Sequence, residues 1–302
     1  MQFRLGTRGS ALALVQANMV RDALCAAHGW DAAGVEIVTI KTTGDRVQDR
    51  ALAEIGGKAL WTKELDRSLL ANEVDACVHS MKDVETIRPA EIAIAAMLPR
   101  ADVRDRLIGA ESIEALRHNA VVGTSSPRRR AQLLRMRPDL QIVLFRGNVG
   151  TRLAKLAAGE VDATLLAAAG LDRLDRGDVG VAIPTDVMLP APAQGAVGIE
   201  VRASDEAARA AVAAIDHAET MTCVLAERAL LAALGGDCHT PIGAMASLAG
   251  ETLRLRTQLL AEDGSSQVEG SIEGVEGENC GRALAADLLA RAPVEIRRLF
   301  AA

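Results

Sequence analysis

The chain has 302 residues, of which 49% are hydrophobic and 25% are charged, a composition typical of a globular protein rather than a disordered or collagen-like one. At roughly 100–200 residues per domain, this length predicts two or three domains. The net charge of −6, the 2% aromatic content and the lack of tyrosine argue against a protein that binds nucleic acid through a basic surface or stacked rings.

No run of about 18 apolar residues occurs, and the first residues lack the apolar core of a secretory signal. The five cysteines are widely and irregularly spaced, without a CxxC pair, so neither a zinc site nor a thioredoxin motif is indicated. We therefore expect a cytoplasmic protein with reduced thiols that does not cross a membrane.

Over its first 200 residues, the sequence alternates segments typical of helices with short apolar segments typical of strands. Ser10 is a good N-cap and Gly29 a good C-terminal stop, so a helix is expected between them. The segments that follow are a strand at 35–40, a helix at about 57–72, strands at 75–81, 92–98 and 120–123, a helix from Pro127, a strand at 140–145, a helix at about 149–159 and a strand at 163–168. This alternation predicts an α/β fold with mostly parallel sheets covered by helices on both faces.

A polar, positively charged segment near 100–106 and a proline-rich segment at 184–194 are candidate crossings between two α/β lobes, and the apolar segment after the second one can return to the first lobe. Near residue 217 the pattern changes to a long helix at 219–234, strands at 253–261 and 267–274, and a helix at about 278–291. We predict three domains: a first lobe from 1–99 and 195–216, a second lobe at 100–194, and a C-terminal α+β domain at 217–302.

Several turns between a strand and a helix carry basic residues. Segment 123–130 reads GTSSPRRR, in which Ser126 can cap a helix whose N–H groups favour an anion. Segment 145–152, FRGNVGTR, repeats this arrangement, and TRGS at 7–10 and GGK at 56–58 are similar. Each turn alone could equally be a capped helix with solvated arginines. Together, in an acidic chain, they predict a polyanionic small ligand at the carboxyl ends of the strands.

The segment HSMKD at 79–83 ends a predicted strand with adjacent Lys82 and Asp83. These two residues form either a surface pair or a carboxylate in a cleft, where it can move protons or stabilise a cation. We interpret His79 as a structural histidine.

Cys238 lies in the glycine-rich segment LGGDCHTPIG, whose glycines are expected to leave it exposed, whereas Cys25, Cys77 and Cys223 lie in apolar segments and are expected to be packed. A neighbouring aspartate would raise its thiol pKa and a neighbouring histidine would lower it, so the sequence leaves its reactivity open. A metal site here lacks further ligands, and no metal is predicted.

Eight motifs occur in order along the chain: TRGSALALVQA, IGGKALWTKEL, ACVHSMKDV, VGTSSPRRRAQL, FRGNVGTRLAKL, LAAAGLDRL, PAQGAVGIE and AERALLAALGGDCHTPIG. Together they resemble the porphobilinogen deaminase (hydroxymethylbilane synthase) family over essentially the whole chain. The resemblance implies two lobes like those of periplasmic binding proteins and a third domain with a cysteine loop.

The activity that this resemblance implies is that of a transferase of porphyrin, tetrapyrrole and heme biosynthesis. Such an enzyme condenses four porphobilinogen molecules head to tail, loses ammonia at each addition, and releases hydroxymethylbilane by hydrolysis. The implied cofactor is dipyrromethane, attached to Cys238 through a thioether bond. The resemblance further implies a monomer whose product passes to uroporphyrinogen-III synthase.

The resemblance also assigns roles to individual residues. Asp83 matches the catalytic aspartate, which would bind pyrrole N–H groups and stabilise positive charge. The residues implied to bind the cofactor are Cys238, Lys82, Asp83, Thr124, Ser125, Ser126, Arg128, Arg129, Arg146 and Gly147. The residues implied to bind substrate are Arg8, Ser10, Lys58, Arg146, Arg152 and Arg173.

Further positions of interest are Gln194 and Gly195, which fall at the hinge between lobes, and Trp61, an aromatic position over the cleft. The chain departs from many members at Glu54, where they carry lysine, and at Asp237, which separates the two glycines from Cys238. The alternative function is a two-lobed anion receptor without chemistry. Such a receptor needs neither an exposed cysteine nor a third domain, so Cys238 distinguishes the two.

Overall fold

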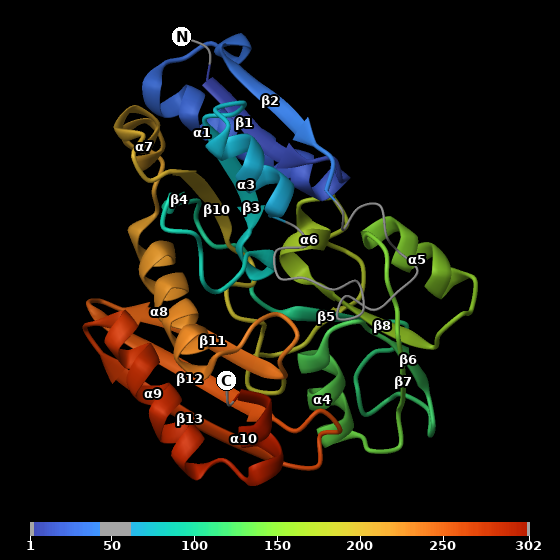
Figure 1. Ribbon diagram of the computed structural model, residues 1–302. Coiled ribbons are helices and arrows are strands. Elements are labelled where there is room, and N and C mark those ends of the chain that lie inside the picture. The colour runs from blue at the N-terminus through green and yellow to red at the C-terminus, as the bar shows by residue number, and fades with distance from the viewer. Residues whose placement is uncertain (1–2, 43–61, 301–302) are drawn as a thin grey trace. The chain divides into compact units, whose positions relative to one another are not determined.

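The structure is a computed structural model that describes residues 3–42 and 62–300 (Figure 1). The chain forms two compact units, one from residues 1–101 and 195–221 and the other from residues 102–194 and 222–302. The chain thus changes unit twice near the predicted crossings, and a third time inside the long helix that starts at Ala218.

The first unit contains a mixed sheet with the strand order β2-β1-β3-β10-β4 among its described residues. Its strands are β1 (Phe3–Arg8), β2 (Val35–Ile40), β3 (Ala76–Ser80), β4 (Ile92–Met97) and β10 (Val197–Arg202). Helices α1 (Ala11–His28) and α7 (Glu206–Ala213) pack with one set of buried strand residues, and α3 (Lys63–Leu70) packs with the other set. Because side chains alternate along a strand, the helices cover both faces of the sheet.

The second unit contains a sheet of the same kind, with the strand order β7-β6-β8-β5-β9. Its strands are β5 (Asp105–Ile108), β6 (Val121–Gly123), β7 (Gln141–Val143), β8 (Ala163–Ala167) and β9 (Val181–Ala182). Helix α4 (Pro127–Met136) contributes to one hydrophobic cluster, whereas α5 (Val149–Ala157) and α6 (Ala168–Asp172) contribute to another. Both faces of this sheet are therefore covered as well.

The second unit also holds an antiparallel sheet of β11 (Ile242–Ala249), β12 (Thr252–Leu260) and β13 (Gln267–Gly274). Its helices are α8 (Ala218–Leu234), α9 (Gly277–Arg291) and α10 (Val294–Phe300). Side chains of these helices and strands form one hydrophobic cluster. The border predicted between the second lobe and the C-terminal domain falls inside this unit, and it stays a prediction.

The predicted α/β class is confirmed, but the sheets are mixed rather than mostly parallel. In each five-stranded sheet two strand pairings are parallel and two are antiparallel. The antiparallel pairings come from β10 and β5, which follow the crossings and begin where parallel strands end: Val197 pairs with Ser80, and Asp105 with Ala167. A strand that begins beside the carboxyl end of its neighbour must run antiparallel to that neighbour.

Most predicted elements lie within a few residues of their observed bounds, and β10 returns to the first sheet as expected. Elements without a predicted counterpart include β5, α6, β9, α7, β11 and α10. The segment that forms β5 reads DRLI and looks like a polar turn. The N-terminal part of the helix predicted at about 57–72 lies outside the described residues.

Candidate active site

A pocket in the first unit lies at the carboxyl ends of β1 and β3. Arg8 ends β1, Ser80 ends β3, and Ser10 caps α1 by accepting a hydrogen bond from the Ala13 N–H at 3.3 Å. The Gln16 side-chain amide donates a 2.8 Å hydrogen bond to the Ser80 hydroxyl. Arg8, Ser10, Gln16 and Ser80 line the pocket together with Asp83. The structure therefore brings together three residues predicted from sequence: Arg8, Ser10 and Asp83.

Asp83 lies in a 3-10 turn, Met81–Asp83, that directly follows β3. The Met81 side chain is buried, and a Cβ at Gly198 of the neighbouring strand would overlap its sulfur, so a glycine is needed there. The Met81 N–H also donates to the Ala196 carbonyl at 3.1 Å. These contacts fix the turn and leave Lys82 and Asp83 half-buried instead of on opposite sides of an extended strand.

A buried ionic network lies beside this pocket. Glu200 is fully buried, and its carboxylate accepts hydrogen bonds from Arg88 Nε and Nη2, both at 2.8 Å. His79, which lines the pocket, places Nε2 3.2 Å from Glu200. Burial by itself would raise the pKa of Glu200, but His79 and Arg88 have the larger effect and lower this pKa to about 2. Arg88 also pairs with Asp66 and Glu85. Sequence reasoning missed this network because its members are far apart along the chain.

In the second unit, two strand-to-helix turns lie at the carboxyl ends of β6 and β7. Ser126 caps α4 by accepting from the Arg129 N–H, and Thr124 Oγ1 accepts from the Ser126 N–H at 3.2 Å. Asn148 caps α5 in the same way. Gly147 has φ of 124°, and a Cβ there would lie 2.7 Å from the Thr151 side chain. These turns therefore present hydroxyl groups and backbone N–H groups, as an anion site requires.

Arg152 connects these two turns. Its Nε donates to the Gly147 carbonyl at 2.9 Å, and its Nη2 donates to the Ser125 hydroxyl at 3.4 Å. Arg146 is half-buried in the second turn, and Arg173 follows α6, where burial lowers its pKa. The structure thus places Arg152 in contact with both Ser125 and Gly147.

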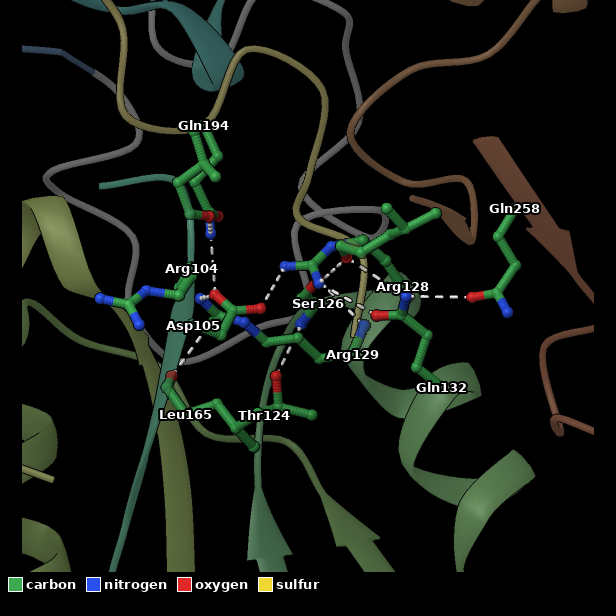
Figure 2. Close-up of polar contacts among 12 residues, drawn as sticks. Arg104, Asp105, Thr124, Ser126, Arg128, Arg129, Gln132, Leu165, Gln194 and Gln258 are labelled. Atoms are coloured by element: carbon green, nitrogen blue, oxygen red, sulfur yellow. Dashed lines mark hydrogen bonds and ion pairs between the residues drawn. The ribbon is translucent and has the colours of Figure 1, made fainter. Parts of the chain in front are cut away.

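Unlike Arg152, Arg128 and Arg129 point their guanidinium groups toward a buried carboxylate, that of Asp105 (Figure 2). Nη2 of Arg128 lies 2.8 Å from Asp105 Oδ2, and Nη2 of Arg129 lies 2.7 Å from Asp105 Oδ1. Both arginines are buried, whereas Arg130 is exposed. Sequence reasoning missed Asp105 because its segment looks like a polar turn.

Cys238 is exposed in the loop between α8 and β11. Thr240 Oγ1 accepts from the Asp237 N–H at 3.0 Å and donates to the Asp237 carbonyl at 2.6 Å, and Asp237 Oδ1 accepts from the His239 N–H at 2.8 Å. All five cysteines lie in the described ranges, and none forms a disulfide. The loop around Cys238 is therefore fixed by hydrogen bonds and leaves the Cys238 side chain exposed.

Lys58, together with Glu54 and Trp61, lies outside the described residues. Within residues 3–42 and 62–300, no group of three or more histidine, cysteine or acidic side chains is placed to hold a metal ion. In the same ranges, no helix has the length and apolar character needed to span a bilayer.

Comparison with known families gives two matches along the chain. Residues 3–210 match the model described as "Porphobilinogen deaminase, dipyromethane cofactor binding domain". The chain belongs to the porphobilinogen deaminase family. Residues 221–290 match the model of the C-terminal domain of porphobilinogen deaminase. The two models together cover nearly all of the described residues.

Curated relatives agree with this assignment. The chain is 57% identical over 304 aligned residues to the porphobilinogen deaminase of Sphingopyxis alaskensis, with 99% of this chain and 96% of the relative covered. It is 52% identical to the porphobilinogen deaminase of Paracoccus denitrificans, with 97% and 95% covered. Among solved structures, substrate binding domain 2 of Lactococcus lactis GlnP is 11% identical with a TM-score of 0.42, covering 78% of this chain and 90% of that one.

Proposed function

We propose that this porphobilinogen deaminase family member condenses four porphobilinogen molecules head to tail on dipyrromethane. Ammonia leaves at each addition, and hydroxymethylbilane is released by hydrolysis. The observation that supports this most strongly is the combination of an exposed cysteine in a held turn with strand-end sites rich in arginine and hydroxyl groups. The first suits a covalent cofactor and the second suits a chain of carboxylates.

The residues present fit dipyrromethane, whose rings carry acetate and propionate groups. When bound, this cofactor supplies the pyrrole to which the first substrate is joined. Cys238 would hold it through a thioether bond, since its sulfur is accessible while the other four cysteines are buried or half-buried. The other residues that would hold its carboxylates and ring N–H groups are Lys82, Asp83, Thr124, Ser125, Ser126, Arg128, Arg129, Arg146 and Gly147.

Asp83 is the proposed catalytic residue. The 3-10 turn holds its carboxylate half-buried in the lining of the first unit's pocket. A carboxylate there can accept hydrogen bonds from pyrrole N–H groups and stabilise the positive charge that develops as ammonia leaves. A fixed charge lowers the barrier most where the surroundings are partly shielded from water.

The proposed substrate-binding residues are Arg8, Ser10, Lys58, Arg146, Arg152 and Arg173. Arg8 and Ser10 lie at the pocket in the first unit, and Arg152 lies between the two turns of the second unit. Guanidinium groups pair with carboxylates in a two-point geometry, so these residues can position the acetate and propionate groups of porphobilinogen.

We also propose a three-domain organisation, with lobes at 1–99 plus 195–216 and at 100–194, and a cofactor-carrying domain at 217–302. The separate hydrophobic cluster of the C-terminal sheet supports this division. A monomer in the cytoplasm, whose product is consumed by uroporphyrinogen-III synthase, completes the proposal. Five cysteines without a disulfide are consistent with a reducing compartment.

The proposed function is tested by supplying purified protein with porphobilinogen and measuring ammonia and hydroxymethylbilane together. We expect four ammonia molecules for each tetrapyrrole, and multiple turnovers per protein molecule. Binding of porphobilinogen without release of ammonia would instead show an anion receptor and contradict the proposal.

A further inference from the structure

Asp105, a residue without an assigned role, is at the centre of a buried polar cluster in the second unit (Figure 2). Its side chain is 1% exposed and lies at the start of β5. Oδ1 accepts from Arg129 Nη2 at 2.7 Å and from Gln194 Nε2 at 2.9 Å, and Oδ2 lies 2.8 Å from Arg128 Nη2. Burial raises the pKa of Asp105, but both guanidinium groups lower it well below its usual range. The carboxylate is therefore charged at neutral pH.

The two arginines are held on their other sides by backbone and side-chain acceptors. Nη1 of Arg128 donates to the Leu189 carbonyl at 2.8 Å and to Gln132 Oε1 at 3.0 Å. Nη1 of Arg129 donates to the Leu165 carbonyl at 2.8 Å. Each guanidinium group is thus fixed from more than one direction, unlike a surface arginine with free rotamers.

The Nε atoms of Arg128 and Arg129 are buried and have no hydrogen-bond partner among the residues that the structure describes. Two guanidinium groups and one carboxylate also leave the cluster with one excess positive charge. Buried donors normally find an acceptor, so two unused N–H groups on side chains from the first turn of α4 indicate a place where an anionic ligand supplies the missing acceptors.

The cluster also holds both segments by which the chain enters and leaves the second lobe. Asp105 lies near the end of the first crossing segment, and Gln194 ends the second one. Gln194 Nε2 donates to the Val103 carbonyl at 2.8 Å as well as to Asp105. Loss of the Asp105 charge would therefore weaken one contact to each arginine at the start of α4 and one contact to Gln194.

We propose that Asp105 is a positioning residue, which orients Arg128 and Arg129 toward ligand carboxylates and fixes them to the crossing segments at Val103 and Gln194. This inference rests on the proposed function, in which the start of α4 binds the carboxylates of dipyrromethane and of the growing chain. Asp105 acts through the arginines and does not touch the ligand.

The test compares Asp105→Asn and Asp105→Glu with wild type as cofactor-loaded proteins, with kcat expressed per loaded molecule by intact mass. In Asp105→Asn the arginines keep their charge but lose their charged partner, and a 1 Å misplacement of a binding group can cost up to about 10²-fold in rate. We expect kcat to fall at least fivefold while KM for porphobilinogen does not rise, because the local positive charge increases. Asp105→Glu keeps the charge and should recover part of the loss.

Asp102→Asn is the matched control, since Asp102 lies in the same crossing but pairs with Arg104 at the surface, and its kcat should equal that of wild type. A purely structural role predicts a lower melting temperature with unchanged kcat, so a loss below fivefold in Asp105→Asn, or a rise in KM alone, overturns the inference. If Asp105→Asn does not fold, Asp105→Glu decides: at least a twofold loss of kcat supports the inference, and a smaller loss overturns it. A wild-type protein without loading or turnover would instead contradict the proposed function.

Discussion

Replacement of Glu200 by glutamine removes a fully buried charge between Arg88 and His79, next to the pocket of Asp83. Burial raises the pKa of Glu200, but its two partners lower it from 4.5 to about 2. At 1.36 kcal/mol per pKa unit, this corresponds to about 3 kcal/mol of stability at neutral pH. Because the folded pKa is lowered, this contribution is complete above pH 4.5 and is lost as the pH falls toward 2.

The expected result for Glu200→Gln is a free energy of unfolding of the first unit that is lower by about 3 kcal/mol at pH 7. Trp30 packs against the hydrophobic cluster of this unit, so its fluorescence during urea unfolding, in a Trp61→Phe background, reports on that unit. The control is Asp22→Asn, because Asp22 is 68% exposed and pairs only at the surface of α1, where a pair contributes less than about 1 kcal/mol. A Glu200→Gln protein as stable as this control, or a difference that grows below pH 4.5, would refute the reasoning.

The remaining predictions concern chemistry. Asp83→Asn should keep the fold and the attached cofactor but lower kcat at least ~10²-fold, because it removes charge stabilisation of the transition state; steady-state kinetics within threefold of wild type would remove Asp83 from the mechanism. Cys238→Ser should carry no covalent pyrrole and should melt at a lower temperature, since a hydroxyl is a far poorer nucleophile and a bound polyanion stabilises the folded state; a pyrrole adduct in its mass spectrum would contradict this. Arg152→Ala should fold but stop chain building, and Arg152→Lys should recover only part of the turnover, because lysine lacks the two-point geometry; normal turnover of the alanine variant would exclude Arg152 from the site.

Much of the fold follows from local sequence signals. Ser10 and Gly29 bound α1, Ser126 and Pro127 start α4, and the apolar segments form the strands. The direction of β10 and β5 depends instead on the edge at which the crossings return to each sheet, which no local pattern encodes. Strand β5 was missed for a related reason: charged residues in a strand look like a turn until their buried partners are known.

The residues of the candidate site likewise fall into those that a local motif predicts and those that depend on tertiary packing. Glycine and hydroxyl residues in the strand-end turns carry a local signal, and the structure brings Ser125, Gly147 and Arg152 together as the motifs suggest. Asp105 gives no such signal, because its partners Arg129 and Gln194 lie 24 and 89 positions away. A buried charge pair is formed by tertiary packing, and the sequence of either partner alone does not show it.

The most direct test of the account is the intact mass of the purified protein, followed by peptide mapping. The account predicts an excess equal to two linked pyrroles, located on the peptide that contains Cys238 and absent from Cys238→Ser. An unmodified wild-type mass in protein that nevertheless turns over porphobilinogen, or an adduct on another residue, would contradict the claim that Cys238 carries the cofactor.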